Sequence, residues 1–202
     1  MLIFAFGSNL SREQMRRRCP GCTLVGPAML DGYRLAFGSY SAGWDGGVAT
    51  VVRAKGHKVR GVLYHMEEPE VLRLDRFEGC PAQYQRVSGR VRWGRKHVTA
   101  SWYVLNAKPF TAPSARYLAA IATGYREFRF SKKALRASLV YTRDRMLEQA
   151  AKERKRRRAG AGRPAYSWTP QPRQSRTCPP PASRQIEMWQ KRHGTGEWWK
   201  AG

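Results

Sequence analysis

Apolar segments of strand length, separated by turn residues, dominate the first third of the chain. Leu2–Phe6, Val48–Arg53 and Val59–His65 are short apolar runs, and a polar Lys-Gly-His turn separates the last two. Residues 23–37 are also largely apolar, but Gly-Pro and Asp-Gly pairs interrupt them. Since such pairs mark turns, this segment is predicted to form short strands joined by turns.

A hairpin is predicted further along the chain. Tyr84–Trp93 and Val98–Leu105 alternate apolar and polar residues on either side of a Gly-Arg-Lys turn, which is typical of two antiparallel strands. Residues 38–47 are rich in Gly and Ser and are predicted to form a loop.

Helical patterns account for most of the remaining residues up to 150. Ser11 is predicted to cap the first helix, with Gln14 at the capping-box position, and Pro69 suits the first turn of the second. The predicted helices cover residues 11–18, 69–77, 114–128 and 131–149. Strands and helices together predict an α+β fold, a small mixed barrel-like sheet with helices packed outside.

The composition changes near residue 150. Residues 152–158 read K-E-R-K-R-R-R, and residues 159–181 are rich in Gly, Pro, Arg and Ser, with little capacity to bury a core. We therefore predict one domain over residues 1–150, followed over residues 151–202 by a basic Pro/Arg/Trp-rich tail, extended or partly disordered.

The net charge of the chain is unusually positive. It holds 38 Lys and Arg against 14 Asp and Glu, a net charge of +24, and residues 152–202 contribute 13 basic and 3 acidic residues to it. The tail also carries four of the seven Trp residues. Basic residues interleaved with aromatic ones suit single-stranded nucleic acid, so nucleic-acid or ribonucleoprotein contact is one hypothesis. A tail docked on its own domain or on a protein, or a biased codon composition, explains the same pattern.

Other classes of protein fit the sequence less well. Hydrophobic residues make up 42% of the chain, so wholesale disorder is excluded. No apolar run approaches the roughly 20 residues of a membrane span, and the N-terminus lacks a secretory pattern, so we expect a cytoplasmic protein without a membrane segment. Cys19 and Cys22 form a lone C-x-x-C around a Pro-Gly turn, better suited to closing a helix than to metal or redox chemistry. No metal or other cofactor is expected.

The first ten residues give the clearest indication of a binding or catalytic site. An apolar strand ends in Gly7-Ser8-Asn9, and a helix-compatible segment follows. Such a turn can aim several backbone N–H groups at one point and hold a carboxylate or an oxyanion. Taken alone, the pattern fits equally an ordinary strand exit in which Asn9 or Ser11 caps a helix.

Four motifs resemble, in order and at compatible spacing, those of the gamma-glutamylcyclotransferase family. Residues 4–10 (F-A-F-G-S-N-L) resemble its opening F-A-Y-G-S-N-L, with Phe6 in place of Tyr. Residues 44–51 resemble its W-x-G-G-[IV]-A-T segment, residues 59–64 its V-x-G-V-[LVW]-[YW] strand, and residues 74–79 its L-D-x-x-E-G motif. The resemblance implies a mixed α/β barrel.

The resemblance also implies an activity: cyclisation of the gamma-glutamyl group of an amino acid or amine derivative to 5-oxoproline, with release of the free amine. Glu78 is the implied catalytic residue, which moves a proton from the substrate's α-ammonium to the leaving amine. Its position at a helix end beside Phe77 favours partial desolvation and a raised pKa. Without the resemblance, a solvated surface charge is the commoner role for such a Glu.

The family's substrate pocket maps onto the opening strand and turn and onto two tyrosines. The backbone N–H groups of Gly7 and Ser8 would hold the γ-carbonyl oxygen or the α-carboxylate, and Asn9 would brace the turn. Half-buried Tyr side chains also commonly only pack. The implied substrate-binding residues are Ile3, Phe4, Ala5, Phe6, Gly7, Ser8, Asn9, Tyr84 and Tyr117. A non-catalytic member of the fold that binds nucleic acid is the alternative.

Overall fold

The structure is a computed structural model that describes residues 1–106 and 109–158. Its strands are β1 (Leu2–Ala5), β2 (Thr23–Ser41), β3 (Gly46–His65), β4 (Tyr84–Trp93) and β5 (Lys96–Leu105). Its helices are a 3-10 turn η1 (Ser8–Leu10), α1 (Arg12–Arg18), α2 (Glu68–Glu78), α3 (Ala115–Glu127) and α4 (Lys133–Arg158). The predicted tail beyond Arg158 lies outside the described residues.

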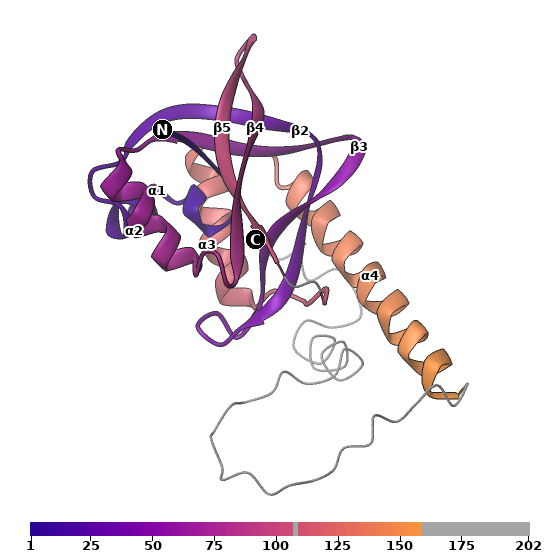
Figure 1. The fold of residues 1–202 in the computed structure, drawn as a ribbon. Helices are drawn as coiled ribbons and strands as arrows, with labels where there is room; N and C mark the ends of the chain where they lie inside the picture. The colour runs from indigo at the N-terminus through magenta and orange to yellow at the C-terminus, as the bar shows by residue number, and fades with distance from the viewer. Residues whose placement is uncertain (107–108, 159–202) are drawn as a thin grey trace, which may run out of the picture.

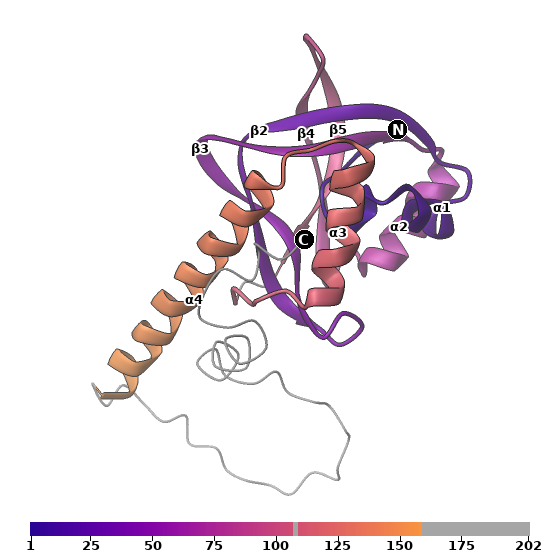
Figure 2. The same cartoon turned by 180° about the vertical axis from the view of Figure 1, so that it is seen from behind.

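The five strands close into a barrel in the order β1-β3-β2-β4-β5. Neighbouring strands are antiparallel except β1 and β5, which pair in parallel at Ile3 and Ser101. The helices lie outside the sheet, with α1 and α2 together at one end and α4 along another side (Figures 1 and 2). The predicted α+β fold, a small mixed barrel with flanking helices, is confirmed.

Strands β2 and β3 are long and continuous, and here the prediction of short strands was wrong. The Gly-Pro and Asp-Gly pairs of β2 lie at register shifts, where Gly26 and Gly32 have positive φ of 141° and 77°. In β3 the residues of the expected turn, 55–57, also lie within the continuous strand, and Gly56 has a positive φ of 80°. Because the two strands pair along almost their whole length, the turn residues become bulges and bends within one twisted ribbon.

The loop between β2 and β3 is shorter than predicted, covering residues 42–45 instead of 38–47. Strand β3 begins at Gly46, where the backbone of residues 111–114 packs directly against Gly46 and Gly47. A Cβ at Gly47 would lie 2.1 Å from the carbonyl oxygen of Thr111, so no other residue fits there without backbone movement. The loop therefore has a rigid base.

Most of the predicted helices are confirmed to within a residue or two. Ser11 caps α1, its Oγ accepting a hydrogen bond from the backbone N–H of Gln14 at 3.4 Å, and Pro69 lies in the first turn of α2. The Gln14 side chain does not complete a capping box. It donates instead to Ser8 Oγ at 2.7 Å and thereby ties α1 to the turn η1.

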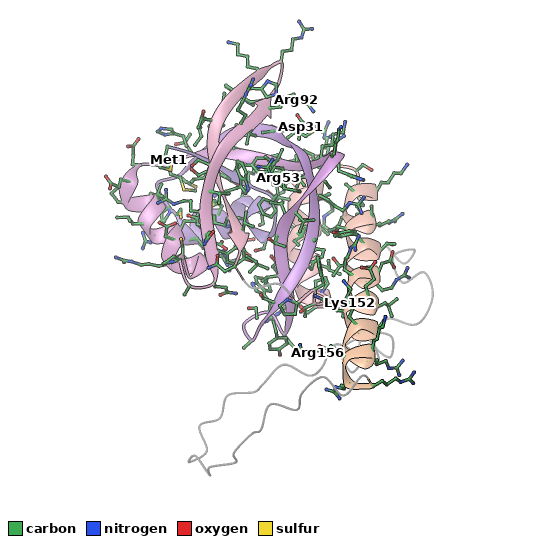
Figure 3. The ribbon with its side chains drawn as sticks, turned by 45° about the vertical axis from the view of Figure 1, so that its right-hand side comes forward. Met1, Asp31, Arg53, Arg92, Lys152 and Arg156 are labelled. Atoms are coloured by element: carbon green, nitrogen blue, oxygen red, sulfur yellow. The ribbon has the colours of Figure 1, made fainter. Side chains whose placement is uncertain are left out.

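Helix α4 is longer than predicted and continues past residue 150 to Arg158. Its first half packs on β2, where the backbone N–H of Phe37 donates to Thr142 Oγ1 at 3.1 Å. Residues 151–158 are exposed and extend beyond the barrel, as Lys152 and Arg156 show in Figure 3. The basic block that was assigned to an extended tail is therefore the end of a helix, while the division into domain and tail stays a prediction.

Cys19 and Cys22 lie at the C-terminal end of α1, as a helix-closing turn requires. Burial raises the pKa of the Cys19 thiol to about 12 and that of Cys22 in the same direction. Thiols with raised pKa values are poor nucleophiles, so this turn is structural. Among the described residues, no helix combines the length and apolarity that a membrane span needs, and no three His, Cys, Asp or Glu side chains form a metal-binding group.

One packing contact fixes the turn η1 against α3. A Cβ at Gly124 would lie 2.3 Å from Leu10 Cβ and 3.0 Å from the backbone nitrogen of Ser11. Ala normally stabilises a helix relative to Gly by about 1 kcal/mol, but overpacking a core costs roughly 1–3 kcal/mol. We therefore expect Gly124→Ala to lower the free energy of unfolding, measured by urea denaturation.

The control is Gly43→Ala, since a Cβ there meets only Ser41 Oγ at 3.8 Å. A Gly124→Ala protein at least as stable as the unmodified chain would show that this helix does not clamp the turn.

Candidate active site

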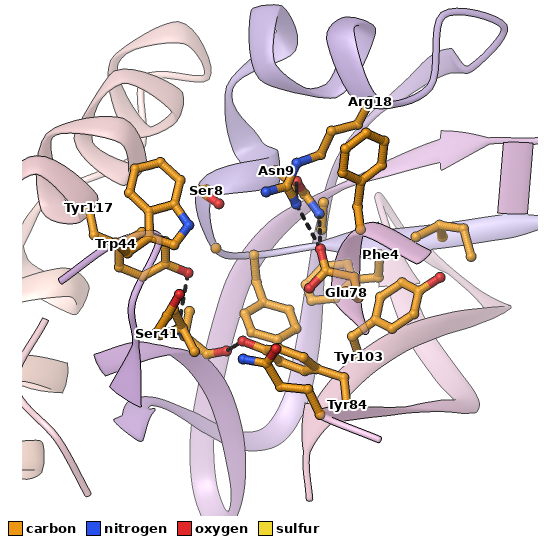
Figure 4. A pocket seen from close by; sticks show the side chains of 18 residues that line it. Phe4, Ser8, Asn9, Arg18, Ser41, Trp44, Glu78, Tyr84, Tyr103 and Tyr117 are labelled. Atoms are coloured by element: carbon orange, nitrogen blue, oxygen red, sulfur yellow. Dashed lines mark hydrogen bonds and ion pairs between the residues drawn. The ribbon is translucent and has the colours of Figure 1, made fainter. Parts of the chain in front are cut away.

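One cavity of about 100 Å³ lies where the opening strand and turn meet α2 and α3, and Figure 4 shows its lining from close by. All ten residues that the sequence singled out line it: Ile3, Phe4, Ala5, Phe6, Gly7, Ser8, Asn9, Glu78, Tyr84 and Tyr117. Residues far apart in the chain are thus brought together at one place. Their roles toward a ligand stay predictions.

Glu78 is the last residue of α2, and its carboxylate is nearly buried, with 13% of the side chain exposed. Gly79 ends the helix in the left-handed conformation at φ 63°, which turns the chain away directly after Glu78. Burial raises the pKa of the Glu78 carboxyl above its usual value, as the sequence led us to expect, and Arg18 and Asn9 oppose part of that rise.

Two donors hold the carboxylate of Glu78 from the opposite wall (Figure 4). Asn9 Nδ2 donates to Glu78 Oε1 at 2.8 Å, and Arg18 Nη1 donates to the same oxygen at 2.9 Å. Arg18 Nη1 also lies 3.0 Å from Asn9 Oδ1. Asn9 was expected to brace its own turn, and it does more, because it connects that turn directly to Glu78.

Arg18 is a site residue that the sequence analysis missed. It lies in a run of three arginines at the end of α1, a pattern typical of a solvated helix end. In the structure its guanidinium packs 5.5 Å from the centre of the Phe77 ring and forms an ion pair with Glu78 that is largely withdrawn from solvent. Nothing in the sequence distinguishes Arg18 from Arg16 and Arg17. Only the packing of α1 against α2 places Arg18 beside Glu78.

Tyr84 and Tyr117 both use their hydroxyls to hold β3. Tyr84 donates to the carbonyl oxygen of Ala49 at 3.0 Å, and the N–H of Ala49 donates to the hydroxyl oxygen of Tyr117 at 3.0 Å. Burial raises the pKa of Tyr117 to about 12 and that of Tyr84 well above its usual value, so both remain neutral. The hydroxyl of Tyr84 thus has a structural partner, and the hydroxyl of Tyr117 accepts from Ala49 and also forms a hydrogen bond with the side chain of Ser8.

Gly7 lies in close contact with β3 and α3. Its φ of −101° is accessible to any residue, but a Cβ there would lie 3.0 Å from Ala49 Cβ and 3.3 Å from the hydroxyl of Tyr117. The N–H groups at the start of a helical turn find no acceptor within that turn. Ser8 and Asn9, at the start of η1, line the cavity.

Phe6 is buried, and its ring centre lies 6.1 Å from that of Phe4. The ring therefore packs in the cavity wall.

The structure adds further lining residues that the sequence analysis did not assign to the site. Among them, Tyr103 donates its hydroxyl to Asp75 Oδ1 at 2.7 Å, and Arg86 Nε lies 3.1 Å from the same oxygen. Trp44 stood within a family motif but had no assigned role. The additional lining residues are Arg18, Ser41, Trp44, Val48, Ala49, Phe77, Gln83 and Tyr103.

Comparison with known proteins agrees with the fold and the motifs. The family model for gamma-glutamyl cyclotransferase, AIG2-like proteins matches residues 3–124. This chain belongs to that family. It is 31% identical to the gamma-glutamylcyclotransferase of Mus musculus over 133 residues, which cover 62% of this chain and 70% of the relative. The identity to the Homo sapiens gamma-glutamylcyclotransferase is also 31%, over 132 residues, with the same coverage.

A solved structure of a gamma-glutamyl cyclotransferase superimposes with a TM-score of 0.62 and 28% identity, over 72% of this chain and 85% of that one. The family model, which matches residues 3–124, includes every residue that lines the cavity. Nucleic-acid or ribonucleoprotein contact was predicted through residues 152–202, of which 159–202 lie outside the described residues, and the comparisons do not support it, so that hypothesis stays a prediction.

The site generates one prediction that is independent of catalysis. Because Arg18 lowers the pKa of Glu78 against the effect of burial, Arg18→Leu is expected to raise that pKa further. Carboxyl carbon NMR of isotope-labelled protein follows the titration, with Glu78→Gln used to assign the signal. Arg17→Leu is the control, since Arg17 is exposed and pairs with Glu13. A Glu78 pKa that is unchanged in Arg18→Leu would contradict the assigned ion pair.

Proposed function

We propose that this chain is a gamma-glutamylcyclotransferase-type enzyme that converts the gamma-glutamyl group of an amino acid or amine derivative to 5-oxoproline. The observation that supports this most is the nearly buried Glu78 carboxylate, held by Asn9 and Arg18 in the cavity that the Gly7–Asn9 turn lines. The family relationship and the curated relatives named gamma-glutamylcyclotransferase support the same activity.

The reaction is intramolecular. The substrate's α-amine attacks its own γ-carbonyl carbon and forms a five-membered ring, and the bond from that carbon to the distal nitrogen then breaks. The nucleophile comes from the substrate, so the protein must move protons, stabilise the oxyanion and hold the chain folded.

Glu78 is the proposed proton carrier. Its carboxylate takes a proton from the α-ammonium, which frees the amine to attack, and later delivers a proton to the departing nitrogen. A carboxyl with a raised pKa suits both steps, because its pKa lies nearer to that of the groups with which it exchanges protons. Arg18 and Asn9 bind one carboxylate oxygen, Oε1, so Oε2 stays available on the other side.

The turn that follows β1 supplies the proposed oxyanion site. The N–H groups of Ser8 and Asn9 and the hydroxyl of Tyr117 are neutral donors fixed by packing, and fixed donors stabilise a developing negative charge without reorganisation. Holding the flexible glutamyl chain folded between this turn and Glu78 brings the amine close to the carbonyl carbon.

The decisive experiment measures 5-oxoproline release from a panel of gamma-glutamyl amino acids and amines by the full-length protein. Glu78→Gln is expected to reduce kcat by about 10²- to 10⁴-fold, the usual contribution of a positioned acid–base group. Glu68→Gln, an exposed change on the same helix, is expected to retain activity. Activity that persists in Glu78→Gln would refute the assigned role of this residue.

Absence of turnover by the unmodified protein on every substrate of the panel would refute the proposed activity itself.

A further inference from the structure

The loop of residues 42–45 between β2 and β3 forms part of the cavity rim. Its base is rigid, since Gly46 and Gly47 pack against the backbone of residues 111–114. Two hydrogen bonds tie the loop to the end of β2. The N–H of Trp44 donates to the carbonyl oxygen of Ser41 at 3.2 Å, and the hydroxyl of Tyr40 donates to Asp45 Oδ1 at 2.7 Å. A short, braced loop of this kind holds its side chains in a defined position.

Trp44 is the residue of this loop that reaches the cavity. Its ring lines the cavity together with Tyr117, and the two ring centres are 4.9 Å apart. Trp44 is also partly exposed, unlike the buried Tyr117. Phe77 and Gln83 also line the cavity and are more exposed, so Trp44 marks only the part of the opening that the loop of residues 42–45 forms.

Arg116, in the first turn of α3, contacts Trp44 without itself lining the cavity. Its guanidinium carbon is 5.3 Å from the centre of the Trp44 ring, and Nη2 donates to the carbonyl oxygen of Gly43. Arg116 is exposed and forms no ion pair with any carboxylate among the described residues. A guanidinium has five N–H donors in a planar fork that matches a carboxylate, so donors remain for a ligand.

Glu78 and Trp44 lie on opposite sides of the cavity, with Ser8 between them (Figure 4). If the glutamyl group reacts beside Glu78, the part of the substrate that extends farthest from it is directed toward Trp44. Arg18 is the cation that lines the cavity in the described part of the chain, and it already pairs with Glu78, whereas Arg116 contacts the lining residue Trp44 from outside the lining. Arg116 is therefore the cation that can meet a substrate at the opening.

We propose that Trp44 and Arg116 form the subsite for the leaving amine, and that Arg116 selects leaving groups that carry a carboxylate. The inference rests on the proposed cyclotransferase function and names the part of the chain that sets its substrate preference. The Trp44 ring supports the leaving group and holds the guanidinium in place, and the guanidinium binds the carboxylate. Amino acids are then better leaving groups for this site than simple amines.

Two substrates that differ by only that carboxylate test the subsite. Gamma-glutamyl-L-alanine releases alanine, and gamma-glutamyl-ethylamide releases ethylamine, which is alanine without its carboxylate. The quantity measured is the ratio of kcat/KM for the two substrates. The chemical reactivity of the two leaving groups contributes equally in every variant, so a change in the ratio reports the subsite.

Arg116→Gln is expected to lower this ratio by about fivefold through a higher KM for gamma-glutamyl-L-alanine, as loss of a partly exposed charge pair of about 1 kcal/mol implies. Trp44→Ala is expected to lower it as well, whereas Trp44→Phe, which keeps a ring under the guanidinium, largely retains it. Arg126→Gln is the control, since Arg126 lies at the other end of α3 and bonds to Thr123.

Salt gives a second measurement on the unmodified protein, which needs no variant to fold. Raising the ionic strength screens an exposed charge pair, so the preference for the alanine derivative is expected to fall. If the protein turns over both substrates but neither Arg116→Gln nor added salt changes the ratio of kcat/KM, the subsite is refuted and the proposed function stands. Turnover of neither substrate by the unmodified protein would overturn the proposed function, and the subsite with it.

Discussion

The burial of one negative charge, on Glu78, governs the arrangement of this molecule. A carboxylate withdrawn from water costs several kcal/mol unless charged or hydrogen-bonding partners replace the lost hydration. Asn9 and Arg18 supply those partners, both on Oε1 and both within 2.9 Å. They come from a turn and a helix near the start of the chain, so α1, η1 and α2 must lie together before the charge can be buried.

The barrel and α3 set the position of that turn by contact on two sides. Gly7 lies in tight contact with Ala49 on β3, and Leu10 lies against Gly124 on α3 at a distance that leaves no room for another Cβ. The hydroxyl of Tyr117 then links α3 to β3 through Ala49. Close packing of this kind keeps Asn9 facing Glu78, and the same walls enclose the cavity in which we propose the cyclisation takes place.

Local patterns predicted the parts of this structure that depend on neighbouring residues, and they did not predict the parts that depend on tertiary pairing. Apolar periodicity and capping residues were sufficient for α1, α2 and the β4–β5 hairpin. The Gly-Pro and Asp-Gly pairs of β2 were interpreted as turns, because nothing local shows that β3 pairs with β2 along its whole length. Arg18 and Trp44 were missed as site residues for the same reason, since their partners lie 60 or more residues away. Motif resemblance, not local pattern, brought Glu78 and the opening turn together.

The central claim is that the buried Glu78 carboxylate is the base of the reaction, and the pH dependence of kcat/KM tests it most directly. The carboxylate form must be present for the α-ammonium to lose its proton, so activity falls as the pH decreases through the pKa of Glu78. The account predicts that this acidic limb lies above the usual value for a Glu, coincides with the pKa that NMR measures for Glu78, and moves to higher pH by the same amount in Arg18→Leu. An acidic limb that stays in place when the Glu78 pKa moves would contradict it.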